Sequence, residues 1–251
     1  MQRYFIKKEQ IKKGVATIVG TDVHHITSVM RARVGDALLL CTCEKETFRV
    51  EIIDLDKAEI RAKITEKKEE KVELPVFVTI AQGITKGDKF DLVVQKGTEC
   101  GASAFVPVAM KRCVAKIEAN KAPKKVMRWQ KIALEAARQA HRQSVPEIAT
   151  PTDLHNLIKQ ASAYDVCLFA YEAFETKDQK NLAAIVAQLT PGARVLVLIG
   201  PEGGIDEKEV ALLQAVGFVP IGLGPRILRT ETAPLYVLAA LSYGLEIERR
   251  I

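Results

Sequence analysis

The chain has 251 residues, of which 48% are hydrophobic and 27% are charged, and its net charge is +6. This composition suits a packed core and argues against wholesale disorder. No apolar run approaches the roughly 18 to 20 residues that a membrane-spanning helix needs, and the N-terminus turns polar too early for a signal peptide. We therefore expect a soluble, cytoplasmic protein.

The basic excess is concentrated in one segment. Between Lys111 and Arg142 there are ten Lys or Arg residues and two acidic residues, so this segment carries +8 and the rest of the chain −2. Such a concentration favours a surface that binds a polyanion. A solvated basic helix face would explain the same charge about equally well.

The first 72 residues, 1–72, have the pattern of a small β-barrel domain. Short β-rich segments alternate apolar and polar residues between charged or Gly-Asp turns. The predicted strands are 15–19, 37–41, 47–53 and 58–64. Between the first two, apolar spacing predicts a helix over 22–33, capped by Thr21 or Asp22 and ended by Gly35.

The charged stretch 66–71 suits a linker, and the pattern after it predicts a second domain over 73–251. Strand and helix patterns alternate in this domain, which indicates an α/β fold with a mostly parallel sheet. The predicted strands are 76–81, 104–108, 166–170, 195–199 and 218–223. The predicted helices are 88–100, 124–142, 179–189, 206–215 and 232–248.

Cysteine and histidine are not arranged as a metal site. The five cysteines are scattered without a Cys-x-x-Cys pair, and the four histidines add no zinc-like spacing. We expect reduced, structural thiols and no bound metal.

Glycine and proline cluster after two of the predicted strands, in segments 198–204 and 220–226. In open parallel sheets, ligands bind outside the carboxyl ends of the strands. Glycine there lets the backbone approach a ligand closely. One such cluster alone is best explained as an ordinary tight turn, but two clusters that each end a buried strand favour a ligand site.

Common nucleotide motifs do not match these loops. The Gly-x-Gly-x-x-Gly pattern fails because Ile227 stands where the third glycine belongs, and the chain has no Gly-Lys-Ser or Gly-Lys-Thr sequence. A dinucleotide or a nucleoside triphosphate is therefore poorly supported, and no Ser-His-Asp arrangement follows from spacing.

The glycine loops carry a resemblance to a known family. The segments 198–204 and 223–233, read as LIGPEGG and LGPRILRTETA, resemble the signature of the knotted SPOUT RNA methyltransferases. More narrowly, the chain resembles the ribosomal RNA small subunit methyltransferase E family. Further matching segments span the chain: Arg3-Tyr4-Phe5, 24–31, Gly35-Asp36, 96–101 and 139–142 before Val145-Pro146.

The resemblance implies a PUA-like β-barrel followed by an α/β domain with a deep C-terminal trefoil knot. It implies a homodimer that binds S-adenosylmethionine in the knot and methylates N3 of one uridine in 16S rRNA, near the decoding region. Two alternatives stay open: a ribose 2′-O-methyltransferase of the same fold, and a catalytically silent RNA-binding homologue.

The candidate cofactor-binding residues lie in the two glycine loops. Glycines would admit the ligand, and backbone groups at Ile199, Gly200, Leu223 and Leu228 would hold its adenosine. The full set is Leu198, Ile199, Gly200, Gly203, Gly204, Gly222, Leu223, Gly224, Ile227 and Leu228.

Two side chains are candidates for catalysis. Arg229 would stabilise the uridine imidate or bind phosphate, although a structural pairing with Glu202 or Glu231 is nearly as well supported. Glu202 is a possible base, but it would equally suit a cap for the helix that starts near Asp206.

Cationic residues in both domains are candidates for RNA binding. They are Arg3, Arg31, Arg33, Lys111, Arg112, Arg138 and Arg142. Arg138 stands where relatives usually carry an acidic residue, which puts its own role in doubt. Of His24 and His25, we expect one to be a hydrogen-bonded packing residue.

Three further expectations concern packing. Phe90 and Trp129 fall in helical patterns and are assigned to a core or an interface. The C-terminal helix carries a wide apolar stripe that would cover the core and meet a second subunit. Its members are Leu235, Leu238, Ala239, Leu241, Ser242 and Leu245.

Overall fold

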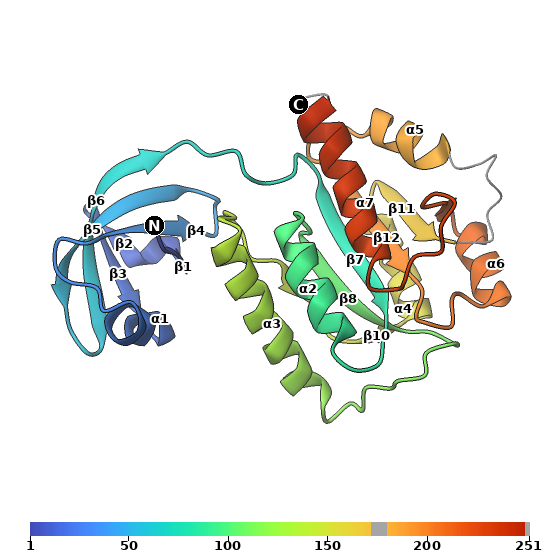
Figure 1. Ribbon diagram of the computed structural model, residues 1–251, viewed down its shortest axis with the longest axis horizontal. Coiled ribbons are helices and arrows are strands. Elements are labelled where there is room, and N and C mark those ends of the chain that lie inside the picture. Colours follow the sequence, from blue (N-terminus) through green and yellow to red (C-terminus); the bar gives the residue numbers. More distant parts are fainter. Residues whose placement is uncertain (172–179, 249–251) are drawn as a thin grey trace. The chain divides into compact units, whose positions relative to one another are not determined.

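The computed structural model describes residues 1–171 and 180–248, which fall into two compact units (Figure 1). Unit 1 comprises Met1–Glu73 together with Ala137–Ser144. Unit 2 comprises Leu74–Ala136 and Val145–Ile251. The octapeptide Ala137–Ser144 therefore groups with the N-terminal unit, although it lies within the sequence expected to form the second domain.

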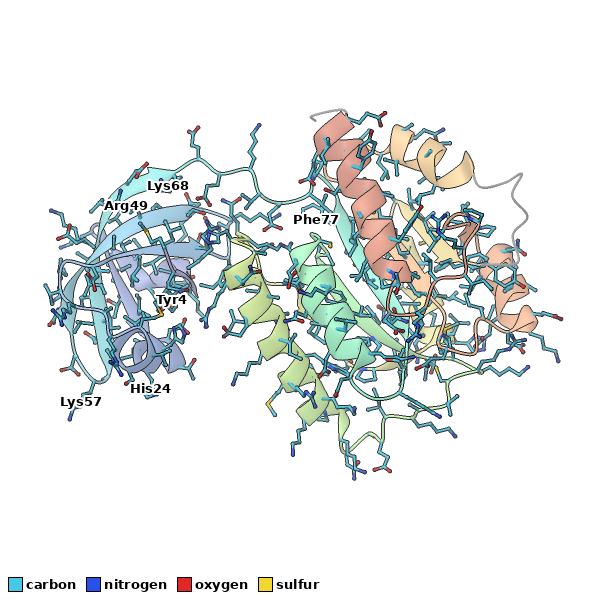
Figure 2. The ribbon with its side chains drawn as sticks, viewed as in Figure 1. Tyr4, His24, Arg49, Lys57, Lys68 and Phe77 are labelled. Atoms are coloured by element: carbon cyan, nitrogen blue, oxygen red, sulfur yellow. The ribbon has the colours of Figure 1, made fainter. Side chains whose placement is uncertain are left out.

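Unit 1 is built on a six-stranded sheet in the order β1-β4-β5-β6-β3-β2. Its first strand pairs parallel with β4 and the other neighbours pair antiparallel. Along β5, Val50 and Ile52 are buried and alternate with exposed Arg49 and Glu51 (Figure 2), so one face covers a core. The strands are β1 Arg3–Ile6, β2 Ile11–Lys12, β3 Val15–Val19, β4 Ala37–Thr42, β5 Thr47–Leu55 and β6 Glu59–Lys68.

The helical segment of unit 1 is shorter than expected. It comprises α1, Thr21–His24, and a π-helical turn, His25–Val29. Gly20, with φ of +79°, precedes it, and no side chain caps its first turn. The predicted cap by Thr21 or Asp22 was therefore wrong, as was the predicted end at Gly35. Asp22 instead pairs with Arg138.

The predicted linker also needs correction. Residues 66–68 belong to β6, where Glu66 pairs with Arg49 and Lys68 with Thr47 across the ladder to β5. A charged strand of this kind is stable because long antiparallel hairpins tolerate solvent on one face.

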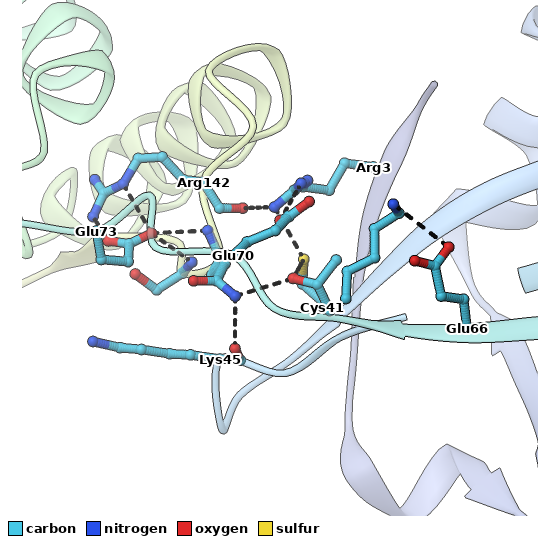
Figure 3. A network of polar contacts seen from close by, with 11 residues as sticks. Arg3, Cys41, Lys45, Glu66, Glu70, Glu73 and Arg142 are labelled. Atoms are coloured by element: carbon cyan, nitrogen blue, oxygen red, sulfur yellow. Dashed lines mark hydrogen bonds and ion pairs between the residues drawn. The ribbon is translucent and has the colours of Figure 1, made fainter. Parts of the chain in front are cut away.

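A polar network joins Ala137–Ser144 to the rest of unit 1 (Figure 3). The Arg142 guanidinium pairs with the Glu73 carboxylate, and the Gln143 N–H donates to Glu73 Oε1 at 2.8 Å. The Arg3 guanidinium pairs with Glu70 at 2.7 Å and donates to the Arg142 carbonyl at 3.1 Å. Buried charges are tolerated when they are paired and hydrogen-bonded in this way.

Unit 2 contains a parallel sheet in the order β10-β8-β7-β12-β11-β13, with β9 also paired to β8. In β12 every residue after Arg194 is buried, because helices cover both faces of a parallel sheet. The strands are β7 Phe77–Gly83, β8 Ala104–Ala109, β9 Glu147–Ile148, β10 Thr152–Asp153, β11 Val166–Ala170, β12 Arg194–Ile199 and β13 Val219–Ile221. The predicted α/β class is confirmed.

The longer helices follow the predicted pattern. They are α2 Lys89–Glu99, α3 Ala122–Gln139, α5 Lys180–Gln188, α6 Glu207–Ala215 and α7 Ala233–Ser242, with α4 Leu154–Lys159 in addition. A π-helical turn, Tyr243–Glu248, continues α7. Gln179, the predicted start of α5, lies outside the described residues.

Aromatic packing and thiol chemistry agree with the sequence. The rings of Phe90 and Trp129 lie 4.3 Å apart in the core of unit 2, as predicted. All five cysteines are free thiols. No helix within 1–171 and 180–248 has the length and apolarity to cross a membrane, and the same residues hold no cluster of potential metal ligands.

The Glu73 pair makes the stability of unit 1 depend on pH. Burial raises the pKa of the Glu73 carboxyl, but the Arg142 guanidinium and the Gln143 N–H outweigh it and hold the pKa below its usual 4.5. A carboxyl with a depressed folded pKa stabilises the fold above its unfolded pKa, and this contribution is lost as the pH falls through the folded value. We expect acid to lower the melting temperature of unit 1 below pH 4.5.

Glu73→Gln should remove this part of the acid dependence and should cost roughly 3 kcal/mol near neutrality, because it leaves the buried Arg142 charge unpaired. Thermal melts followed by circular dichroism between pH 3 and 7 measure both effects. The exposed Glu69→Gln variant is the control, and an equal response of the two variants would contradict the assignment.

Candidate functional site

A cavity of about 730 Å³ lies at the carboxyl ends of three neighbouring strands of unit 2. Its walls are the loop that follows β12, the longer segment that follows β13, and Ala170 and Tyr171 at the end of β11. Nine of the ten predicted cofactor-binding residues line it. Leu198 does not, because it is the buried fifth residue of β12 and packs in the core.

Strand register brings the two glycine loops together. Leu198 of β12 lies opposite Phe169 of β11, and Ile221 of β13 lies opposite Ala170 on the other side of β11. The strands are parallel, so the loops beginning at Gly200 and Gly222 leave the same edge of the sheet on either side of β11. This is the position at which open α/β sheets bind ligands.

Backbone conformation or close packing favours glycine at several positions of the two loops. Gly204 and Gly224 have φ values of +71° and +89°, in the left-handed region that other residues avoid. A Cβ on Gly200 would lie 2.8 Å from Ile205 Cγ1. A Cβ on Gly203 would lie 3.0 Å from the carbonyl oxygen of Arg112. Glycine at position 203 is therefore favoured by the close approach of Arg112 as well as by the cavity.

A chain of hydrogen bonds connects the two loops. The Thr230 hydroxyl donates to the Gly200 carbonyl at 2.6 Å, and Gln82 Nε2 donates to the Thr230 hydroxyl at 2.8 Å. Gln82 is buried at the end of β7. The adjacent Gly83 passes so close to the first loop that a Cβ would lie 2.5 Å from the Pro201 nitrogen.

A charged clip makes a second connection. We define it as Lys89, Glu202 and Glu231: Lys89 Nζ lies 3.1 Å from Glu202 Oε1 and 3.6 Å from Glu231 Oε2. Glu202 belongs to the first loop, Glu231 follows the second, and Lys89 begins α2. The Lys86 N–H also donates to Glu202 Oε1, at 3.1 Å.

Lys89 and Glu202 are both charged at neutral pH. The hydrogen bond from the ammonium to Glu202 raises the Lys89 pKa above its usual 10.5, since it outweighs the desolvation that lowers it. Partial burial raises the pKa of Glu202, but backbone N–H groups and the Lys89 ammonium outweigh it and lower the pKa below 4.5.

The two predicted catalytic residues, Arg229 and Glu202, both line the cavity. Neither has the alternative structural role that the sequence also allowed. Within 1–171 and 180–248, Arg229 forms no ion pair with Glu202 or Glu231, whereas Lys89 pairs with both carboxylates. The alternative role of Glu202 as a helix cap is wrong. Asp206 caps α6 instead, in a reciprocal capping box with Glu209.

The predicted RNA-binding cations of unit 2 lie beside the cavity. Arg112 lines it and donates to the Gly203 carbonyl at 3.3 Å. Lys111 Nζ lies 2.9 Å from Asp206 Oδ2, and Arg112 Nε lies 3.6 Å from the same oxygen. Both side chains are exposed, and Asp206 neutralises part of their charge.

The predicted cations of unit 1 divide into exposed and buried ones. Arg31 and Arg33 are exposed. Arg3 and Arg142 are only 2% exposed and pair with Glu70 and Glu73, so neither presents its guanidinium to a phosphate.

The Arg138 side chain is also largely covered, with 9% of its surface exposed. Its guanidinium pairs with Asp22 and lies 5.2 Å from the Tyr4 ring centroid, which is a cation–π contact. The prediction that Arg3, Arg138 and Arg142 contact RNA is therefore withdrawn. Arg138 and Arg142 belong to the basic segment, so its +8 overstates its surface charge.

The two histidines behave as expected. His25 Nδ1 and the Tyr4 hydroxyl are hydrogen-bonded at 2.9 Å, whereas His24 is exposed (Figure 2). Sequence reasoning missed Gln82, Lys89, Thr230 and the role of Glu231. No local pattern marks them, because their partners lie far away in the chain.

Comparisons with known proteins agree with this architecture. A family model described as an RNA methyltransferase domain matches residues 72–242, and one described as an RNA methyltransferase PUA domain matches residues 19–65. A Bacillus subtilis relative, ribosomal RNA small subunit methyltransferase E, is 43% identical over 99% of both chains.

Solved structures extend the comparison. Ribosomal RNA small subunit methyltransferase E of Neisseria gonorrhoeae, bound to S-adenosylmethionine, is 28% identical with a TM-score of 0.83 and covers 96% of this chain and 97% of its own. A Legionella pneumophila protein in complex with the same cofactor is 30% identical, with a TM-score of 0.81 and 96% of both chains covered.

The fold, the loop pair and these matches define an RNA methyltransferase with a PUA-like N-terminal domain. Within that class, the chain belongs to the ribosomal RNA small subunit methyltransferase E family, as the resemblance predicted.

The charged clip predicts a measurable coupling between the loops. Lys89→Met should increase amide hydrogen exchange about fivefold in both 200–204 and 229–231, because one ammonium restrains both segments. Lys89→Arg should retain most of the protection. Exchange is measured by mass spectrometry on the ligand-free protein.

Lys96→Met is the matched control, since Lys96 lies on the same helix and pairs with its neighbour Glu99 at 2.9 Å. Faster exchange in only one loop of Lys89→Met would refute the coupling.

Proposed function

We propose that the protein transfers a methyl group from S-adenosylmethionine to N3 of a specific uridine in 16S rRNA, in the decoding region of the small ribosomal subunit. The observation that carries the proposal is the cavity between two glycine loops at the carboxyl ends of β12 and β13. Family membership and relatives solved with this cofactor support it.

The residues of the cavity suit the cofactor. A volume of about 730 Å³ falls within the range of small-molecule sites. Ile199, Leu223 and Leu228 supply apolar surface for a flat adenine, and backbone groups of the loops supply polar contacts. At Gly204 a Cβ would meet nothing within 4 Å, so the loop leaves open space there.

The bound cofactor supplies an electrophilic methyl group on a sulfonium. The protein must orient the uracil ring, remove the proton from N3 and stabilise the resulting negative charge. In the transfer, the N3–carbon bond forms as the carbon–sulfur bond breaks, and its electron pair passes to sulfur.

Arg229 and Glu202 divide these tasks in our proposal. The Arg229 guanidinium is exposed at the cavity and stabilises the imidate that forms when N3 loses its proton. The ionised Glu202 carboxylate accepts this proton and passes it to water. Its lowered pKa makes it a weak base, so the reaction depends on Arg229 making N3 more acidic.

The cofactor contacts follow the predicted set. We propose that the nine lining residues, from Ile199 to Leu228, bind the cofactor, and that Leu198 supports them from the core. For RNA, we retain the exposed cations Arg31, Arg33, Lys111 and Arg112.

We further propose that the C-terminal segment forms the family's trefoil knot and that the enzyme is a homodimer. The Thr230–Gly200 hydrogen bond supports the first proposal, because it holds the segment after β13 against the loop after β12. The predicted apolar stripe of the C-terminal helix covers the core, since its members Leu238, Leu241 and Leu245 are buried there.

A different apolar strip of the same helix supports the dimer. Tyr236, Tyr243 and Ile247 are exposed at spacings of seven and four residues. Large exposed apolar side chains on one helix face are typical of a subunit interface.

Calorimetry tests the cofactor proposal. The wild-type protein should bind S-adenosylmethionine, and Gly203→Val should abolish binding, because its side chain would press on the Arg112 backbone and displace the loop. Gly192→Ala is the control: Gly192 has φ of +86° and lies before β12, so the substitution strains unit 2 away from the cavity. No heat of binding with millimolar cofactor and wild-type protein would exclude the proposed enzyme.

Product analysis tests the position of methylation. Nuclease digests of small-subunit rRNA from a strain without the enzyme should lack one N3-methyluridine, and adding the purified protein and cofactor should restore it. Mass spectrometry with chromatography separates this nucleoside from 2′-O-methyluridine. Restoration of the ribose-methylated product would establish the alternative reaction.

A further inference from the structure

Three carboxylates line the cavity, and they belong to Glu202, Glu207 and Glu231. S-adenosylmethionine carries a positive charge on its sulfonium and another on the α-ammonium of its methionine part. A carboxylate in the cavity wall is therefore a suitable partner for one of these two groups. The contacts that each carboxylate makes within the protein decide which of the three is available.

Two of the carboxylates are already hydrogen-bonded or open to solvent. Glu202 accepts the Lys86 N–H at 3.1 Å and pairs with the Lys89 ammonium at 3.1 Å. Glu207 is exposed in the first turn of α6, where the helix dipole stabilises it and solvent weakens its attraction for a ligand. Neither of them needs a ligand to complete its contacts.

Glu231 differs from both. Its side chain is 12% exposed, and the Lys89 ammonium lies 3.6 Å from Oε2, which is longer than a hydrogen bond. Oε2 is buried and accepts no hydrogen bond from the described part of the chain. A sheltered carboxylate that has lost water without gaining a donor in its place is costly. Because Glu231 lines the cavity, a ligand can supply the missing donor.

The charges of the clip favour a cationic donor. Lys89 Nζ is closer to Glu202, at 3.1 Å, than to Glu231, at 3.6 Å, so Glu231 has the weaker share of the one ammonium. With both carboxylates ionised, the clip carries a net charge of −1. A positive ligand group beside Glu231 would balance this charge in a site that is partly shielded from water.

We propose that Glu231 binds the α-ammonium of S-adenosylmethionine and so makes the methionine part of the cofactor a recognised group. The sulfonium is also positive, but it has no N–H or O–H to donate. The ribose hydroxyls can donate, but they bring no charge to the clip. The inference rests on the proposed function, because it takes S-adenosylmethionine as the cofactor.

Three ligands separate these contacts in calorimetry of the full-length protein. S-adenosylmethionine has both positive groups, S-adenosylhomocysteine keeps the ammonium without the sulfonium, and deaminated S-adenosylhomocysteine has neither. Glu231→Gln should weaken binding of the first two ligands about tenfold, because a neutral amide replaces the charged partner of the ammonium. The deaminated ligand should bind Glu231→Gln and the wild type equally well.

Two further variants act as controls. Glu207→Gln removes an exposed carboxylate from the same cavity wall and should change the affinity for each ligand by less than about twofold. Lys89→Met breaks the clip but keeps the Glu231 carboxylate. It should retain at least the wild-type ratio of affinities for S-adenosylhomocysteine and its deaminated analogue, even where looser loops weaken both. Thermal melts establish that each variant is folded.

Several outcomes would overturn the inference. Equal losses for all three ligands in Glu231→Gln would show that Glu231 only supports the loops. A loss confined to S-adenosylmethionine would assign Glu231 to the sulfonium instead. A fall of the affinity ratio in Lys89→Met as large as in Glu231→Gln would mean that the whole clip, and not Glu231, recognises the ammonium. Failure of the proposed function is recognised separately, as a wild-type protein that binds none of the three ligands.

Discussion

The hydrogen bond from the Thr230 hydroxyl to the Gly200 carbonyl is the contact on which the candidate site depends. At 2.6 Å it joins two segments that follow different strands, and Gln82 fixes the hydroxyl from a third. The parallel sheet brings the loops to one edge, but register alone does not determine how far apart they stand. The glycines then allow the backbones to approach, and the clip of Lys89, Glu202 and Glu231 fixes the outer side. Glycine thus gives the loops their conformational freedom, and polar contacts between distant parts of the chain hold them in one arrangement. This is what a preorganised binding site requires.

Much of the fold could be predicted because its signals are local. The strands Val15–Val19 and Val166–Ala170 were predicted with their observed bounds, since β-branched and apolar runs between turn residues have few other stable conformations. The short strand Arg3–Ile6 was missed, because its pairing with β4 brings together residues that no local pattern connects. The extension of β6 to Lys68 was missed for the opposite reason: its charged residues have the composition of a linker, and pairing with β5 overrides that preference.

In the candidate site, too, the features with a local sequence signal could be predicted and those that depend on distant contacts could not. The glycine loops could be found because glycine is required by backbone conformation, which is a property of each position. Lys89 could not, because its partners lie more than a hundred residues away in the sequence and an isolated lysine carries no signal. The largest error concerned the arginines that were predicted to bind RNA. Cationic residues such as Arg3, Arg138 and Arg142 are typical of a nucleic-acid surface, yet each of these three is paired with a carboxylate and at most 9% of its side chain is exposed. Only tertiary structure distinguishes these two uses of arginine.

The membership of Ala137–Ser144 in unit 1 has a consequence for how the protein is made and how it can evolve. The chain leaves unit 1 after Glu73 and returns to it only at Ala137, so a nascent chain completes this unit after about 70 more residues have been synthesised. Until then, Glu73 has no Arg142 to pair with. For the same reason, exchange of the N-terminal domain between relatives by a single recombination event would separate these two residues from their native partners. Successful chimeras would need two crossovers, or an independent change that neutralises the carboxylate and the guanidinium together.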